Sequence, residues 1–170
     1  MALDTTVGGA TSDSYGTLAE YETYVVAAID ANFNGHGHDA THELNLRRAA
    51  QYLDRKYSFV GMQQYQSQSR SWPRLTDALI DGWPIDPDTV PDAIKHAQFE
   101  VAYSMEVGGI SPMATLTTGA VKLTRSKAGP VEAETEYMMA RDTPRFVAVE
   151  GLLRGYVRSG RSGQVRMGRG

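Results

Sequence analysis

The stretch "SWPRLTDALIDGWPIDPDTVPDAIKHAQFE", residues 71–100, contains both tryptophans of the chain and four of its seven prolines. Proline restricts the backbone to an extended path, and a tryptophan side chain can bury roughly 200 Å² of surface. The first half of the stretch is therefore expected to be a stiff connection without regular structure, held in place by its indole rings. The second half predicts a helix that begins beside Pro91, because proline is favoured in the first helical turn.

Two Trp-Pro pairs, Trp72-Pro73 and Trp83-Pro84, are the candidate anchors of this connection. Because aromatic side chains are highly buried on average, the favoured interpretation of Trp72 is packing against the core of its own chain. For Trp83, packing within the chain and contact between subunits stay equally open.

Upstream of these pairs, apolar residues recur at helical spacing in two segments. The first, residues 17–33, opens with Thr17 and Glu20, which have the spacing of a capping box. The second spans residues 39–57. The two segments predict two amphipathic helices joined by a glycine-rich loop.

Downstream, Asp88 is expected to cap the third helix, which ends at Gly108. Residues 114–137 change period: "AVKLT" and "VEAETEY" alternate around "RSKAGP", which predicts a β-hairpin at about 117–137. A last helix is expected to start near Pro144. The predicted fold is mainly α, a small bundle of about four helices with one β-hairpin and an extended C-terminal arm.

The domain of helices and hairpin is predicted to cover residues 17–157, between two polar ends. Residues 1–16 are rich in Gly, Ser and Thr and are expected to be a flexible tail. Residues 158–170 form a basic Gly/Arg-rich arm. Such a composition buries too little apolar surface to offset its ordering entropy, so the arm is expected to be disordered in isolation.

The arm has two interpretations. Its arginines could bind phosphates of a nucleic acid, or the arm could fold onto a partner protein. Val157, Val165 and Met167 lie between the arginines, and a pure phosphate binder does not need them. The alternation in "QVRM" suits strand addition, so the balance leans slightly toward a protein partner.

Composition excludes several classes of protein. The chain has no cysteine, which excludes disulfides, thiolate catalysis and cysteine-ligated zinc. A net charge of −3 argues against a protein whose whole surface binds nucleic acid. No signal peptide and no membrane-spanning run are expected. No complete catalytic constellation stands out, so neither an enzymatic activity nor a cofactor is predicted.

The stretch "GHGHDATH", residues 35–42, resembles a cluster of metal ligands. Its candidates are His36, His38, Asp39 and His42, and the only other histidine is His96. A metal site needs ligands that converge from several elements. The favoured interpretation is therefore a glycine-rich loop with solvated histidines and no bound metal.

The order of motifs resembles one family. "RSWPR", "VPDAIKHAQFEVA", the hairpin "KLTRSKAGPVEAETEY" and a short proline-started helix are similar to head–tail connector (adaptor) proteins of tailed bacteriophages and gene transfer agents. Many relatives carry the label of DnaT-like single-stranded-DNA-binding proteins. The resemblance covers residues 18–156, and its departures are the longer "GHGHDATHE" loop, Trp83 and an extended hairpin region.

The resemblance implies a structural protein of the virion neck, assembled in the host cytoplasm. Copies of the chain would form a ring of about twelve below the portal protein, which extends the DNA channel and offers a platform to a stopper or tail-terminator protein. Genomic DNA would pass through the lumen without sequence-specific binding. The C-terminal arm would embed in the portal, through Arg158, Arg161, Val165, Arg166, Met167 and Arg169.

The alternative function is that of a DnaT-like single-stranded-DNA-binding accessory protein. Such proteins combine a basic groove with aromatic residues on which bases stack. The negative net charge counts against this alternative.

Overall fold

The computed structural model describes residues 2–34, 38–108, 121–127, 132–137 and 146–158, with the backbone alone for 121–127 and 132–137. Its helices are α1 (Leu18–Ala28), α2 (Asp39–Lys56), α3 (Asp92–Gly108) and α4 (Val147–Leu152). Its strands are β1 (Met62–Gln63), β2 (Arg74–Leu75), β3 (Leu79–Ile80), β4 (Trp83–Pro84), β5 (Val121–Lys127) and β6 (Glu132–Tyr137). The predicted mainly α fold with four helices is confirmed over these residues. None of the described helices is both long and apolar enough to cross a membrane.

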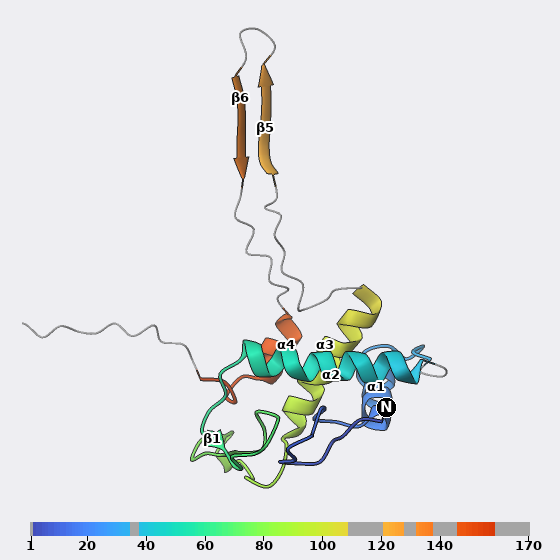
Figure 1. The fold of residues 1–170 in the computed structure, drawn as a ribbon, viewed down its shortest axis with the longest axis vertical. Helices are drawn as coiled ribbons and strands as arrows, with labels where there is room; N and C mark the ends of the chain where they lie inside the picture. Colours follow the sequence, from blue (N-terminus) through green and yellow to red (C-terminus); the bar gives the residue numbers. More distant parts are fainter. Residues whose placement is uncertain (1, 35–37, 109–120, 128–131, 138–145, 159–170) are drawn as a thin grey trace, which may run out of the picture.

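Helices α2 and α3 form the centre of the molecule; α1 packs against both of them, and α4 packs against α3 (Figure 1). The apolar stripes expected from helical spacing are buried on α2 (Leu46, Ala49, Ala50 and Leu53) and on α3 (Ile94, Ala97, Val101 and Met105). Helix α1 buries Tyr21 and Val25 of its expected stripe, whereas Ala28 is exposed. Burial of such stripes supplies most of the driving force for folding.

Helix α1 begins with the predicted capping box. The Glu20 N–H donates to Thr17 Oγ1 at 3.2 Å, and the Thr17 N–H donates to Glu20 Oε2 at 2.7 Å. Two otherwise unpaired backbone donors are satisfied in this way.

The expected flexible tail is wrong, because Ser12, Ser14 and Tyr15 are buried. Residues 13–16 pack against α2 and α3, and residues 9–12 bond to the loop after α2. Arg47 Nε donates to Asp13 Oδ2 at 2.6 Å. The carboxamide of the fully buried Gln98 holds residues 14–16 to the core. It accepts from the backbone N–H groups of Tyr15 (3.0 Å) and Gly16 (3.2 Å) and donates to Ser14 Oγ (2.7 Å) and the Leu46 carbonyl (2.9 Å). Polar residues lie inside here because their hydrogen bonds are satisfied.

The connection between α2 and α3 also differs from the expectation, because it contains two short antiparallel ladders. Strand β1 pairs with β2, and β3 pairs with β4. The second ladder closes through Asp81 and Gly82, whose φ values of 51° and 87° are those of a type I′ turn. The "DG" dipeptide was the local signal for this hairpin.

The expected cap of α3 is wrong. Asp88 Oδ1 accepts from Gln64 Nε2 at 2.7 Å, and the helix begins at Asp92, after Pro91. The Pro91 carbonyl accepts the Ile94 N–H at 2.9 Å.

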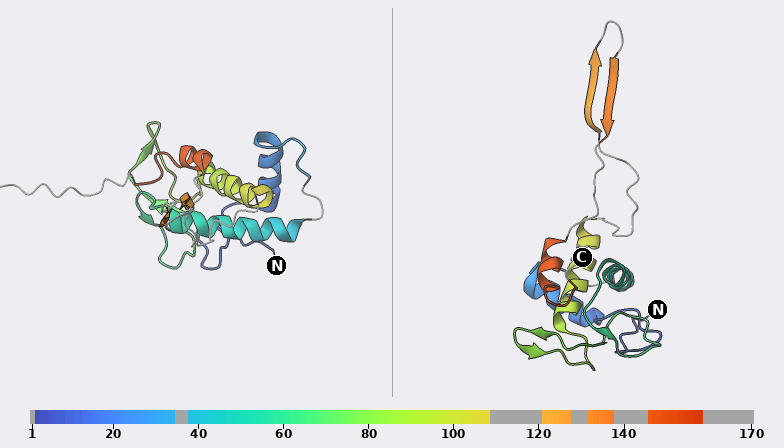
Figure 2. Two further views of the ribbon diagram at one scale, coloured as in Figure 1. Left: turned by 90° about the horizontal axis from the view of Figure 1, so that it is seen from above. Right: turned by 90° about the vertical axis from the view of Figure 1, so that its left-hand side faces the viewer.

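The predicted hairpin is present as β5 and β6, inside the expected range 117–137. Of the elements that the structure describes, these two strands contact only each other. Figure 2 shows the same arrangement from two further directions.

Candidate partner-binding site

Residues 156–158, which precede and begin the C-terminal arm, pair with the loop that follows α2. The Val60 N–H donates to the Tyr156 carbonyl at 2.9 Å, and the Arg158 N–H donates to the Ser58 carbonyl at 2.8 Å. Between these bonds, Phe59 and Val157 form an antiparallel bridge. We call residues 156–158 the arm root.

Trp72 forms the floor beneath the arm root. Its side chain is 1% exposed, and the Phe59 and Tyr156 rings meet it edge-on at centroid distances of 5.8 and 5.9 Å. Pro73 is also buried. Trp72 therefore packs within its own chain, as predicted, and gives the arm root a rigid support.

Arg74, on β2, ties this loop together through backbone carbonyls. Its guanidinium donates to the carbonyls of Val60 at 2.7 Å, Ser71 at 3.0 Å and Gly61 at 2.8 Å. Gly61 has a φ of +73°, and a Cβ there would lie 2.1 Å from the Leu75 carbonyl oxygen. Only glycine fits this close approach of two backbones.

Arg158 extends the same cluster from the arm root. Its Nη2 also donates to the Gly61 carbonyl, at 2.8 Å. Burial lowers the pKa of Arg74 from its ordinary value, and the neighbouring charge of Arg158 lowers it further. Two cations therefore lie beside one backbone carbonyl at the point where the arm begins.

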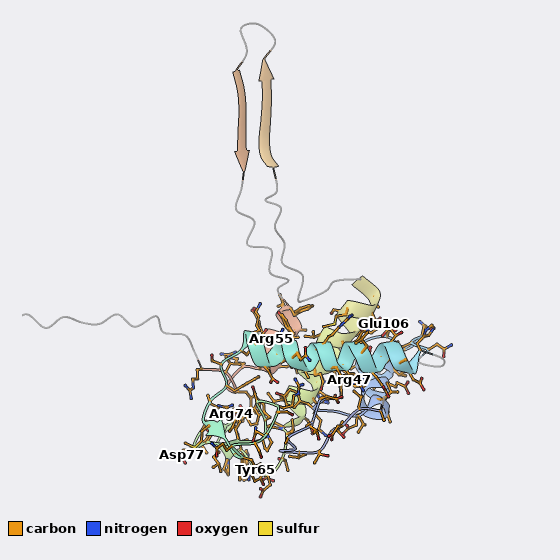
Figure 3. The ribbon with its side chains drawn as sticks, in the orientation of Figure 1. Arg47, Arg55, Tyr65, Arg74, Asp77 and Glu106 are labelled. Carbon is orange, nitrogen blue, oxygen red and sulfur yellow. The ribbon has the colours of Figure 1, made fainter. Side chains whose placement is uncertain are left out.

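Two clefts flank Arg158. One has a volume of about 610 Å³ and is lined by Gly61, Met62, Leu75, Thr76, Asp77, Ala78 and Arg158. The other, of about 300 Å³, lies between Tyr57, Glu150, Leu153, Arg154, Gly155, Val157 and Arg158. Figure 3 shows Arg74 and Asp77 at the end of the molecule near β1, away from Glu106.

Apolar side chains stand at the rim of the larger cleft. Met62 and Leu75 are cross-strand partners in the first ladder and are 64% and 43% exposed. A guanidinium beside an exposed apolar pair suits a protein ligand that presents an apolar side chain next to a carboxylate or carbonyl group.

The remaining predicted site residues are distributed as follows. Trp83 is 77% exposed and Pro84 is also exposed, so the structure leaves both outside the core of their own chain. Arg158 lies at the arm root. The other predicted arm residues, Arg161, Val165, Arg166, Met167 and Arg169, lie outside the described residues.

Sequence reasoning did not assign a role to Gly61, Met62, Arg74 or Leu75. Arg74 belongs to the "SWPR" motif, but the motif alone does not say that its guanidinium binds three carbonyls. The glycine signal at position 61 was present in "FVGM" and could have indicated a turn with positive φ.

The expectation that the histidines of residues 35–42 are solvated is wrong for His42. It lies on α2 with no exposed surface, and its Nε2 is 3.0 Å from Glu106 Oε1. His38 precedes α2 and is exposed, and His96 stacks on Tyr24 with ring centroids 4.4 Å apart. His36 lies outside the described residues.

His42 instead packs where α1, α2 and α3 meet. The Glu106 carboxylate contacts two side chains there. Its Oε1 lies beside His42 Nε2, and its Oε2 accepts a hydrogen bond from the Tyr21 hydroxyl at 3.1 Å. Among the residues with described side chains, no group of three or more His, Asp or Glu side chains could hold a metal ion. His42 is therefore a packing residue of the helices.

Comparison with known proteins gives a family. No curated protein and no solved structure matches the chain. A family model described as "Putative DnaT-like ssDNA binding protein" matches residues 1–170. Because the match spans the whole chain, the protein belongs to this DnaT-like family.

Proposed function

We propose that the protein is a head–tail connector (adaptor) of a tailed phage. Copies of the chain form a ring below the portal protein, extend the DNA channel and provide a platform for a stopper or tail-terminator protein. The protein acts as a structural part of the virion neck and not as an enzyme.

The observation that carries this proposal is the arm root. Arg74, Arg158 and the Trp72 floor fix the point and the direction in which the arm leaves the helices. A ring subunit needs such a fixed exit, because every arm must meet the portal in the same geometry. Rigid support lowers the entropy that is lost on binding.

The composition of the arm supports a protein partner. Arg161, Arg166 and Arg169 supply charge-assisted donors for carboxylates or carbonyls. Val165 and Met167 lie two residues apart, so an extended arm would place them on one side. Several arms on one ring would bind multivalently.

Cosedimentation with portal-containing heads tests the proposal. A chain that ends at residue 158 keeps the arm root, so it should fold normally and fail to cosediment. A variant with Arg161, Arg166 and Arg169 changed to Lys keeps the charge of the arm and serves as the matched control. Normal cosedimentation of the truncated chain would contradict the proposal.

Single-stranded-DNA binding is the second candidate, and it is the activity named in the description of the family. A DNA binder with several phosphate contacts loses affinity steeply as salt rises. Anisotropy of a labelled single strand, measured at low and moderate salt, separates the two functions. Tight binding that weakens with salt and needs the arm would favour the DNA-binding candidate.

A further inference from the structure

The β3–β4 ladder is an apolar wedge on the surface. Leu79 is 61% exposed and Trp83 is 77% exposed. The cross-strand partner of Leu79 is Pro84, and that of Trp83 is Ile80, so Leu79 and Trp83 lie on opposite faces of the ladder. A ladder with exposed apolar groups on both faces is covered better by a groove than by a flat surface.

The wedge is held firmly enough to act as a docking element. Its strands close through the type I′ turn at Asp81 and Gly82, which matches the natural twist of a hairpin. Ile80 anchors the ladder beside Gly155, where an added Cβ would lie 2.9 Å from Ile80 Cδ1. Little conformational entropy would be lost when this element binds.

A groove of about 510 Å³ runs between α1 and α3. On the α1 side, Ala19, Thr23 and Ala27 follow each other at intervals of four residues and leave room for a large side chain. The aromatic lining is the stacked pair of Tyr24 and His96, above the nearly fully buried Phe99. Tryptophan is a frequent anchor of interfaces that contain pockets of this kind.

The wedge and the groove belong to different parts of the molecule. In the left view of Figure 2, the light-green β3–β4 ladder and the blue α1 lie at opposite ends. Trp83 remains 77% exposed although its own chain contains the groove. The groove of one chain is therefore available to the wedge of another.

We propose that the α1–α3 groove binds the Trp83 wedge of a second copy of this chain. The inference rests on the proposed ring and names the two surfaces that meet in it. Because wedge and groove are different surfaces, the contact is head-to-tail, and repetition produces a ring or an open chain of subunits. The Asp92 carboxylate at the groove offers an acceptor for the indole N–H, whereas Glu20 is already bonded to Thr17 and Lys95.

The size of the contact sets its strength. A tryptophan and its neighbours on the wedge bury a few hundred Å², well below the roughly 800 Å² per partner of a stable interface. The free protein is therefore expected to associate weakly, and closely placed neighbours strengthen the contact through effective concentration.

Directed disulfide cross-linking tests the contact. Because the chain has no cysteine of its own, only the introduced cysteines can form a disulfide. One protein carries Leu79→Cys on the wedge, and the other carries Thr23→Cys in the groove. Mixing the two proteins under mild oxidation should yield a mixed dimer at least about tenfold faster than with Thr41→Cys, a matched exposed position on α2. Adding Trp83→Ala to the Leu79→Cys protein should remove this advantage.

Equal rates for the Thr23→Cys and Thr41→Cys pairs would overturn the proposal. Faster cross-linking of Leu79→Cys to itself would also overturn it, because that result indicates a two-fold dimer through the wedge. The experiment contains no portal, so a mixed dimer with no binding to heads would contradict the proposed connector function and leave the head-to-tail contact supported.

Discussion

Arg74 and Arg158, which are far apart in the chain, donate to the same carbonyl oxygen, that of Gly61, each at 2.8 Å. Burial lowers the pKa of Arg74, and the repulsion between these two like charges lowers it further. The bonds to backbone carbonyls offset the repulsion. The consequence is a single junction that joins β2, the loop after α2 and the arm root.

Arg74→Lys is expected to lower the free energy of unfolding by about 1–3 kcal/mol, because an ammonium group cannot reproduce the fork that reaches three carbonyls. Urea denaturation measures the change. Arg48→Lys, at an exposed position on α2, should change stability by less than about 0.5 kcal/mol. Equal effects at the two positions would mean that Arg74 contributes only its charge.

Gly61→Ala should destabilise more than Gly82→Ala, although both glycines have positive φ. Each substitution carries a backbone cost of about 1–2 kcal/mol. At position 61 the new Cβ also meets the Leu75 carbonyl at 2.1 Å, whereas position 82 has open space. Thermal unfolding of the two variants checks the order, and a Gly61→Ala protein as stable as Gly82→Ala would contradict the packing described for the arm root.

Gln98→Leu is expected to release the N-terminal segment. The substitution leaves buried donors and acceptors unpaired at a cost of about 1–3 kcal/mol for each such group. Amide hydrogen exchange at Tyr15 and Gly16 should then accelerate, because their bonds to Gln98 Oε1 are lost. Unchanged protection of these two amides would show that other contacts hold the segment.

The two tryptophans should differ sharply in the free protein. Trp72→Ala is expected to cost about 3–5 kcal/mol of stability, because it empties a filled site in the core. Trp83→Ala should stay within about 0.5 kcal/mol. Acrylamide quenching supplies an independent check: Trp83→Phe should leave a fluorescence that is protected from the quencher, because only the buried Trp72 remains.

Alkaline pH should loosen the contact between α1 and α3. Burial, followed by the charge of Glu100 and the hydrogen bond to it, raises the pKa of Tyr24 to about 12. The folded state holds this proton more tightly than the unfolded chain does. The resulting stability is complete below about pH 10 and is lost as the pH rises toward 12.

Urea unfolding between pH 8 and 11 measures this loss. Tyr24→Phe should flatten the upper part of the curve, and Tyr65→Phe, at an exposed side chain, serves as the control. A curve that is identical in the wild type and in Tyr24→Phe would contradict the raised pKa of Tyr24.

The helices were predictable from the sequence because helix formation and stripe burial depend on residues three and four apart. Leu46, Ala49 and Leu53 mark one face of α2 whatever packs against them. The capping box at Thr17 is local in the same sense. The hairpin at 117–137 was predictable because alternation is also a short-range pattern.

The arm root, the burial of His42 and the packed N-terminal segment were decided only by the tertiary structure. Gln98 meets Ser14, Tyr15 and Leu46 across separations of 84, 83 and 52 residues. A polar residue is buried only where such partners satisfy it, and composition says nothing about which distant groups will arrive. The same reason applies to the serine- and glycine-rich N-terminal segment. Its local sequence pattern is compatible both with a solvated tail and with a segment packed on the core, and only long-range hydrogen bonds determine which of these two states forms.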